Sequence, residues 1–229
     1  MTRFERAFVW VGGGMFVASL ALCVWSYAVW LGRSAPWGGW PPVAVDAALF
    51  AVFAMHHSLF ARDTVKRWLA LIPRRLLRSV YVWIASLLLM LVCLLWQPVG
   101  GELYRAPAFP AAAFAAVQAA GFWITARAVA KIDPLELAGI REGVPATGPS
   151  ALQITGPYRW VRHPVYFGWV LMVFGAAHMT GDRLAFAAIT SLYLCVAVPW
   201  EERALRQSFG ADYDRYMQQV RWRVVPYMY

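Results

Sequence analysis

The stretch GPYRWVRHPVYFG, residues 156–168, places a histidine and two arginines directly before an apolar run. Proline suits the first position of a helix, where its missing N–H would be unpaired in any case, so Pro164 predicts a helix start with His163 at its edge. Tyr166 then lies one turn into the helix, and Gly168 leaves room for close approach. Free N–H groups and the helix dipole suit such a start to a carboxylate or phosphate. The alternative is that the same side chains only anchor the helix at a membrane surface.

A second polar stretch, PWEERALRQSFGADYDRYMQQV from Pro199, begins where the last apolar run ends. Spacings of three and four residues predict one face of an amphipathic helix. That face comprises Glu201, Leu205, Phe209, Tyr213, Tyr216 and Val220. Because an acid on the buried side of a membrane boundary needs a partner, Glu201 is expected to meet a cation. Glu202 is expected on the exposed side, where it can pair with Arg206.

The elements that must position these residues are apolar and long. Hydrophobic residues make up 61% of the 229 residues and charged ones only 14%, against roughly 45–50% and about 25% in soluble chains. Six stretches approach the roughly 17–25 residues that cross a bilayer as a helix. They are 7–31, 43–60, 77–96, 109–129, 164–180 and 184–200. The sequence therefore predicts an all-α, polytopic transmembrane helix bundle that ends in an amphipathic cytosolic helix.

The basic residues indicate how the bundle is oriented. All but four of the 21 lie near the N-terminus, in or beside the loops 61–76 and 130–163, or after residue 199. An even number of spans puts all these segments on one side, which the positive-inside rule identifies as the cytosol. Both termini and the polar stretches are therefore expected at the cytosolic face of a cytoplasmic membrane. The net charge of +9 is assigned to anionic lipid headgroups and not to nucleic acid.

The last two apolar stretches are expected to form a helical hairpin, because only the turn TGDR separates them. Each arm rises roughly 26 Å, so residues 163 and 201 return to the same membrane face. A helix start suited to anions then faces a pair of carboxylates. That arrangement suits a zwitterionic or cationic ligand.

The same stretches resemble a known superfamily. RHPVYFG, EERALRQSFGADYDRYMQQV and the VVP that follows are similar to the signature of the isoprenylcysteine carboxyl methyltransferase and phospholipid methyltransferase superfamily. In the front half, MHHSLFARDTVKRW and IDPLELAGIRE look like its methanethiol S-methyltransferase branch, which has an NnrU-like N-terminal half. The resemblance implies a membrane enzyme, expected in bacteria, that uses S-adenosyl-L-methionine and a small-molecule or lipid methyl acceptor.

The resemblance also implies roles for individual residues. The positions that match cofactor-binding ones are His163, Pro164, Tyr166, Gly168, Glu201 and Glu202. The candidate catalytic residues are His163, Glu201 and Arg127. A thiol acceptor must lose its proton to become a good nucleophile, and either His163 or water could take it. Residues 131–229 would form the cofactor-binding half, and residues 1–130 a scaffold on the acceptor side.

The expected reaction is methyl transfer to a small or lipophilic thiol, as in methanethiol S-methylation. Alternatives with the same cofactor are a phospholipid N-methyltransferase and a prenylcysteine carboxyl methyltransferase. An NADPH-dependent enzyme like the sterol reductases, which share an RHPxY-like motif, is a further alternative. A non-enzymatic, NnrU-like membrane factor is the last, and the intact C-terminal signature disfavours it.

No metal site is expected. Consecutive histidines on a helix point about 100° apart, so His56 and His57 make a poor pair of ligands, although one of them could line the cavity. Cys23, Cys93 and Cys195 fall in three different apolar stretches without paired spacing. They are expected to be small hydrophobic residues.

Overall fold

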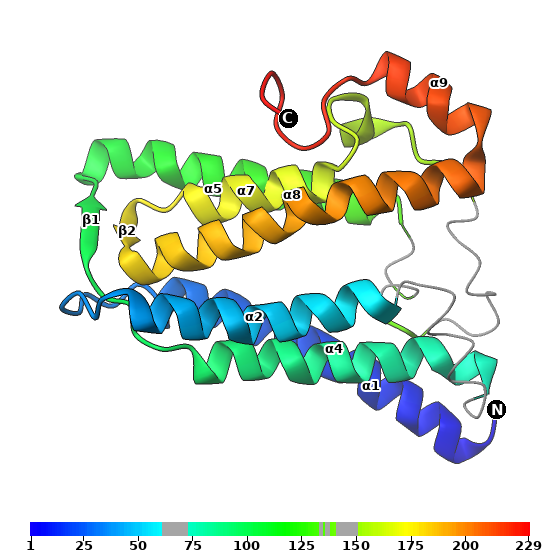
Figure 1. Cartoon of the computed structure of the whole chain (residues 1–229), viewed down its shortest axis with the longest axis horizontal. Helices are drawn as coiled ribbons and strands as arrows, with labels where there is room; N and C mark the ends of the chain where they lie inside the picture. Colours follow the sequence, from blue (N-terminus) through cyan, green and yellow to red (C-terminus); the bar gives the residue numbers. More distant parts are fainter. Residues whose placement is uncertain (61–72, 133–134, 136–137, 141–150) are drawn as a thin grey trace. The chain divides into compact units, whose positions relative to one another are not determined.

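The computed structural model describes residues 1–60, 73–132, 135, 138–140 and 151–229 (Figure 1). Parts of the predicted cytosolic loops 61–76 and 130–163 lie outside the described residues. The α-helices of the described part are α1 (Arg3–Trp25), α2 (Trp40–Phe60), α4 (Arg74–Leu95), α5 (Ala108–Val129), α7 (Pro164–Phe174), α8 (Gly181–Phe209) and α9 (Ala211–Gln219). The shorter elements are the π-helical turn η1 (Ser26–Trp30), the 3-10 turn η2 (Gly156–Arg159) and the strands β1 (Glu102–Arg105) and β2 (His178–Thr180).

Several helices are long and apolar enough to cross a membrane. They are Arg3–Trp30, which combines α1 with η1, and Arg75–Leu95, Ala108–Val129 and Gly181–Phe209. These four segments coincide with the first, third, fourth and sixth predicted stretches, and the second stretch forms the 21-residue α2. The protein is therefore a polytopic helical membrane protein.

The fifth predicted span, 164–180, is shorter as a helix than its sequence indicates. α7 has 11 residues, which rise about 16 Å, against a hydrocarbon core of about 30 Å. The helix ends at Phe174, and the N–H of the next residue, Gly175, donates to the carbonyl of Leu171. The chain then pairs with β1 as strand β2, in an antiparallel arrangement. Hydrogen bonds across this pair replace those of a further helical turn.

The residues form two compact units by their internal contacts. The first comprises Met1–Gly101 and Asp133–Ala146, and the second comprises Glu102–Ile132 and Thr147–Tyr229. α5 thus packs with the helices that follow it, although it precedes the boundary expected at residue 130. The assignment of an acceptor side and a cofactor-binding half to residues 1–130 and 131–229 stays a prediction.

In the first unit, α1 and α2 both pack against α4. The indole Nε1 of Trp83 donates to the carbonyl of Phe8 at 3.0 Å, and the two rings stack at 5.6 Å. The histidine pair of α2 meets α4 at Tyr81. The ring of His56 stacks on Tyr81 at 5.5 Å, and Nδ1 of His57 lies 2.6 Å from its hydroxyl.

In the second unit, α7 is held tightly against α5. A Cβ added to Gly168 would lie 2.6 Å from the carbonyl oxygen of Gly121 and 3.1 Å from the backbone nitrogen of Thr125. Glycine is therefore required where the two backbones cross. α7 also packs beside α8, so the expected hairpin is present, with a shorter first arm (Figure 1).

α8 continues past the predicted end of the last apolar stretch at residue 200. It runs through Pro199 to Phe209, and Gly210, with φ +53°, separates it from α9. Tyr213, Tyr216 and Val220 form a buried cluster against which Leu205 and Phe209 pack. The predicted apolar face is therefore present, but it is shared between the end of α8 and α9.

Candidate active site

His163 stands at the N-terminal edge of α7 and is buried, with 8% of its surface exposed. Its ring stacks on the ring of Tyr166, one turn into the helix, with 5.4 Å between centroids and an interplanar angle of 9°. Its backbone N–H donates to the carbonyl of Arg223 at 2.8 Å. Both the ring and the backbone of His163 are therefore held in place.

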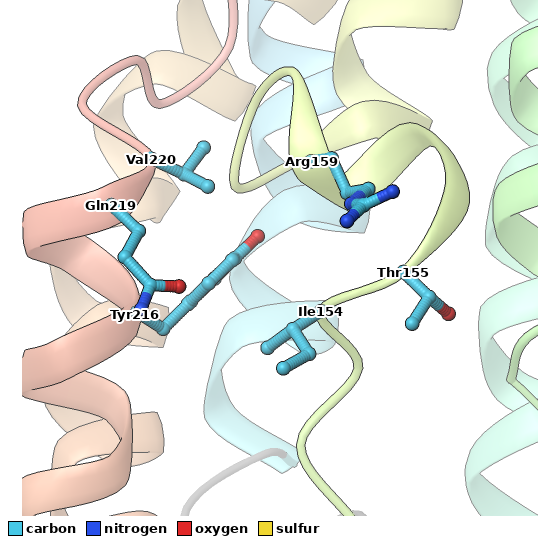
Figure 2. A pocket seen from close by; sticks show the side chains of 6 residues that line it. All are labelled: Ile154, Thr155, Arg159, Tyr216, Gln219 and Val220. Atoms are coloured by element: carbon cyan, nitrogen blue, oxygen red, sulfur yellow. The ribbon is translucent and has the colours of Figure 1, made fainter.

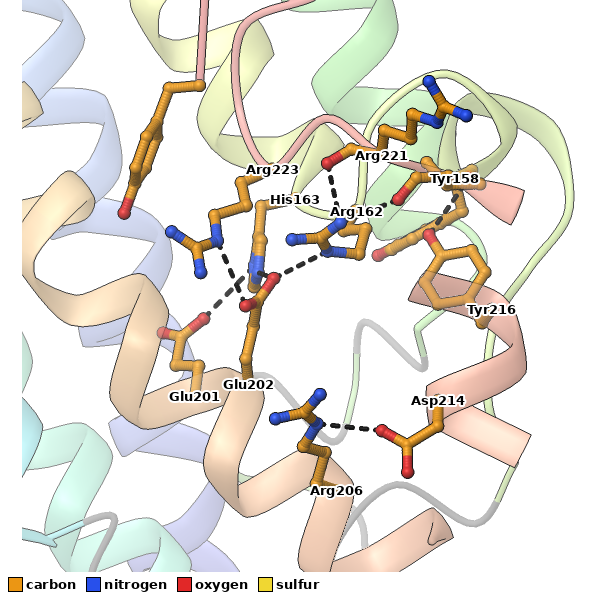
Figure 3. A network of polar contacts seen from close by, with 12 residues as sticks. Tyr158, Arg162, His163, Glu201, Glu202, Arg206, Asp214, Tyr216, Arg221 and Arg223 are labelled. Carbon is orange, nitrogen blue, oxygen red and sulfur yellow. Dashed lines mark hydrogen bonds and ion pairs between the residues drawn. The ribbon is translucent and has the colours of Figure 1, made fainter. Parts of the chain in front are cut away.

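The hairpin of α7 and α8 brings two carboxylates to this histidine (Figure 3). Nδ1 of His163 lies 3.4 Å from Oε2 of Glu201, and Nε2 lies 3.6 Å from Oε1 of Glu202. The hydroxyl of Tyr166 donates to the other oxygen of Glu201. The structure thus brings together four residues that the sequence analysis selected: His163, Tyr166, Glu201 and Glu202.

The environments of the two glutamates are the reverse of those expected. The side chain of Glu202 is 6% exposed and accepts from Nε of Arg162 at 2.6 Å and from Nε of Arg223 at 3.2 Å. The side chain of Glu201 is 41% exposed. The expected pair between Glu202 and Arg206 is wrong, because Arg206 turns to Asp214, at 2.9 Å (Figure 3).

Arg162, the second arginine of the GPYRWVRHPVYFG stretch, was expected to add a fixed charge beside the helix start or to anchor the helix, and it lies inside the network. Its side chain is 5% exposed. Besides Glu202, it donates through Nη1 to the carbonyls of Val220 and Arg221 at 2.7 and 2.8 Å. A buried guanidinium is stable only when its donors are paired. The signal in the sequence was the RHP triplet itself, which places a permanent charge beside the buried histidine.

The remaining selected residues lie in different surroundings. Pro164 is buried, and the N–H groups of Tyr166 and Phe167 already donate to the carbonyl of His163, so the helix start has fewer open donors than expected. Gly168 faces α5. Arg127 is exposed near the end of α5, and among the described residues no hydrogen bond or ion pair joins it to the histidine or the glutamates.

The electrostatics of the site favour a protonated His163. Burial lowers the pKa of His163, but the neighbouring carboxylates of Glu201 and Glu202 raise it further, so that the pKa lies above its ordinary value. Burial raises the pKa of Tyr158 and of Tyr213 to about 12. These two hydroxyls therefore stay neutral, and the negative charge facing His163 is that of the glutamates.

A pocket of about 270 Å³ lies beside this network, between η2 and α9 (Figure 2). Its lining consists of Ile154, Thr155, Arg159, Tyr216, Gln219 and Val220. Val220 connects the pocket with the network, because its carbonyl accepts from Arg162. The lining itself includes neither His163 nor the two glutamates.

The arrangement can bind a cation next to a polar group. Glu202 is neutralised by two arginines, whereas Glu201 keeps a partly exposed carboxylate that is oriented by Tyr166. Nε2 of His163 is buried and makes no hydrogen bond to the described part of the chain. Among the described residues, no group of three histidine, cysteine or acidic side chains is placed to hold a metal ion.

Comparisons with known proteins point to one family. Residues 112–212 match the family described as phospholipid methyltransferase. The chain is 33% identical to a methanethiol S-methyltransferase of Crocosphaera subtropica, covering 77% of this chain and 72% of the relative. It is 34% identical to a methanethiol S-methyltransferase of Mycobacterium tuberculosis, covering 78% and 76%.

A third relative is nurim of Sus scrofa, 30% identical over 72% of this chain and 68% of the relative. No solved structure matches the chain. The family match includes the hairpin that carries the histidine and both glutamates. The chain is a methyltransferase, and it belongs to the phospholipid methyltransferase family.

Proposed function

We propose that this protein is an integral membrane methyltransferase that uses S-adenosyl-L-methionine and methylates a small thiol of the methanethiol type. The observation that carries the proposal is the carboxylate of Glu201, partly exposed and oriented by Tyr166 and His163. The names of the relatives that cover most of the chain support the thiol acceptor.

The residues present fit the positive charge of a sulfonium cofactor. A sulfonium charge is balanced by a carboxylate and by aromatic faces, and Glu201 and Tyr166 provide both. When bound, S-adenosyl-L-methionine supplies an electrophilic methyl group. The cofactor-binding residues we propose are His163, Pro164, Tyr166, Gly168, Glu201 and Glu202. Of these, Glu202 acts through the arginines and the histidine that it contacts.

The protein has two tasks in such a transfer. It must hold the acceptor in line with the methyl group, and it must exclude water from the site. The thiol must also be deprotonated. Because the carboxylates of Glu201 and Glu202 favour the protonated ring, we assign this step to the deprotonated form of His163, in which Nδ1, next to Glu201, accepts the proton. Arg127 remains a proposed catalytic residue that would have to approach the site when ligands are bound.

A second candidate acceptor is an aminophospholipid. The description of the matching family favours it. In either case the acceptor reaches the site from the membrane or its surface, so membrane lipids are the expected neighbours.

We further propose six membrane-inserted segments, in which α2 and α7 complete the four long spans. Both termini and the site then lie at the cytosolic face, in the cytoplasmic membrane of a bacterium. Support comes from the distribution of the 21 basic residues.

The acceptor is tested with purified protein in detergent, incubated with S-adenosyl-L-methionine and methanethiol. Transfer yields dimethyl sulfide, S-adenosylhomocysteine and one proton, and headspace gas chromatography measures the sulfide. Methylation of an added aminophospholipid in place of the thiol would establish the second candidate. Binding of NADPH without binding of S-adenosyl-L-methionine would refute both.

The proposed site is tested with Glu201→Gln, which removes the charge and keeps the shape. Hydrogen bonds and contacts to a charged group contribute about 1.5–3 kcal/mol, so we expect cofactor affinity to fall about 10- to 100-fold. Titration calorimetry measures the affinity. Glu102→Gln is the control, because Glu102 lies in β1 and pairs with His178. Equal affinities of the two variants would disprove the role of Glu201.

A further inference from the structure

α8 contains a proline in its interior, Pro199, two residues before Glu201. Pro199 has no N–H, so the carbonyl of Cys195, four residues earlier, loses its usual partner within the helix. A carbonyl in that position needs another donor. The hydroxyl of Tyr229 supplies it, at 3.2 Å from the oxygen of Cys195.

Tyr229 also organises the segment Val220–Tyr229, which we call the closing loop. Its carbonyl oxygen accepts from the N–H groups of Arg223, Val224 and Val225 at 2.9, 2.8 and 3.1 Å. Its ring lies 5.2 Å below the guanidinium of Arg223. Val224 is 1% exposed, so the loop is docked on the protein.

The closing loop is joined to the site by both backbone and side chains. The N–H groups of Arg162 and His163 donate to the carbonyls of Trp222 and Arg223 at 2.9 and 2.8 Å. Nε of Arg223 lies 3.2 Å from Oε2 of Glu202, on the other side of the carboxylate from Arg162 (Figure 3). Arg223 and Glu202, which both contact His163, are therefore also joined to each other.

We propose that Tyr229 and Arg223 are positioning residues for methyl transfer. The Tyr229 hydroxyl donates a hydrogen bond to the carbonyl of Cys195, which has no helical donor because of Pro199. This bond anchors the closing loop on α8, and the anchored loop holds Arg223 against Glu202. Glu202 then forms ion pairs with two arginines, and Glu201 is the carboxylate that faces the ligand. The inference rests on the proposed function, because it assigns the ligand of Glu201 to the cofactor.

The first test compares Tyr229→Phe with Tyr227→Phe. The first change removes only the hydroxyl that reaches Cys195, and the second removes the hydroxyl of a tyrosine that is 86% exposed in the same loop. One hydrogen bond is worth about 1 kcal/mol, so we expect Tyr229→Phe to raise the dissociation constant and the KM for S-adenosyl-L-methionine about 3- to 10-fold, with a smaller change in kcat. Tyr227→Phe should stay within about twofold of the unchanged protein.

The second test measures the protonation of His163 and needs no methyl transfer. In protein labelled with ¹⁵N-histidine, NMR follows the titration of the four histidines, and His163→Gln identifies the signal of His163. Arg223→Gln removes the positive charge that Arg223 places next to Glu202. The groups that then remain around His163 are Glu201, Glu202, Arg162 and Tyr166. The surroundings of His163 become more negative, so its pKa should rise. Arg223→Lys keeps the charge and should restore most of the original value. Arg221→Gln is the control, because this exposed arginine contributes only its carbonyl to the network.

The outcomes separate the two proposals. Equal cofactor affinities of Tyr229→Phe and Tyr227→Phe, or equal His163 titrations of Arg223→Gln and Arg221→Gln, would overturn the positioning role. If the unchanged protein bound no S-adenosyl-L-methionine while its His163 titration still responded to Arg223, the proposed function would fail and the role of the closing loop in holding His163 would stand.

Discussion

The two adjacent glutamates of α8 have different roles in the site. Consecutive residues on a helix point about 100° apart, so Glu201 and Glu202 face in different directions, although both approach His163. Glu202 turns into the protein, where Arg162 and Arg223 neutralise it, and Glu201 stays 41% exposed beside Tyr166. One carboxylate therefore stabilises the site, and the other is placed to meet a cation.

Loss of the buried carboxylate should destabilise the protein. Glu202→Gln leaves the guanidinium of Arg162 buried without a counter-ion, and breaking such a pair costs about 3 kcal/mol or more. Thermal unfolding in detergent measures the loss. Asp214→Asn is the matched control, because it breaks a pair with Arg206 whose side chains are 53% and 54% exposed, which is worth less than about 1 kcal/mol. Similar losses in both variants would contradict the buried network.

The protonation of His163 should make stability depend on pH. Its pKa in the folded protein lies above the ordinary value of 6.5, because the carboxylates outweigh burial. The folded state therefore binds the proton more tightly than the unfolded state. The resulting stabilisation is complete below about pH 6.5 and is lost as the pH rises through the folded pKa. We expect the midpoint of thermal unfolding to fall over this window, and to fall less in His163→Gln. An unchanged slope in the variant would show that another group is responsible.

At the scale of elements, the site depends on how closely α7 approaches α5. Gly168 and Gly121 lie where the backbones cross, and no side chain separates them. Since α7 carries His163 and Tyr166, any displacement of this helix moves both residues away from the glutamates of α8. The contact between glycines is therefore a condition for the geometry of the site.

A methyl group at this crossing should disturb both stability and binding. In Gly168→Ala, the added Cβ would lie 2.6 Å from the carbonyl of Gly121, so one helix must shift, at a cost of about 1–3 kcal/mol. Thermal unfolding and cofactor titration measure the two effects. Gly14→Ala in α1 is the control, because its added Cβ would meet nothing within 4 Å. Equal behaviour of the two variants would show that the crossing tolerates a side chain.

At the scale of the whole molecule, four long apolar helices among the described residues make this a membrane protein, and all but four of the 21 basic residues fall in segments that an even number of spans would place on one side. The positive-inside rule predicts the cytosolic location of that side. We expect green fluorescent protein to fluoresce when fused to either end, and alkaline phosphatase to be active when inserted at Gly38, between the first two helices. Active phosphatase at the C-terminal end would contradict the orientation.

Much of the architecture could be predicted because it depends on local pattern. The apolar runs predicted the long helices, and Pro164 after His163 predicted the start of α7. The short TGDR turn predicted the hairpin that returns the histidine to the glutamates. These features follow from residues that are near one another in the chain.

The sequence by itself determined the helical class, the positions of the helices along the chain and the two polar stretches that meet. Only the tertiary structure decided that Glu202 is buried, that Arg162 belongs to the site and that α7 ends at Phe174. The physical reason is that periodicity specifies which residues share a face of a helix, but not which partner covers that face. The predicted apolar face is covered from Leu205 onward, while the closing loop covers Glu202, one residue beyond Glu201. Which partner covers a given face is determined by contacts between residues distant in the sequence, such as the hydrogen bond from Tyr229 to Cys195.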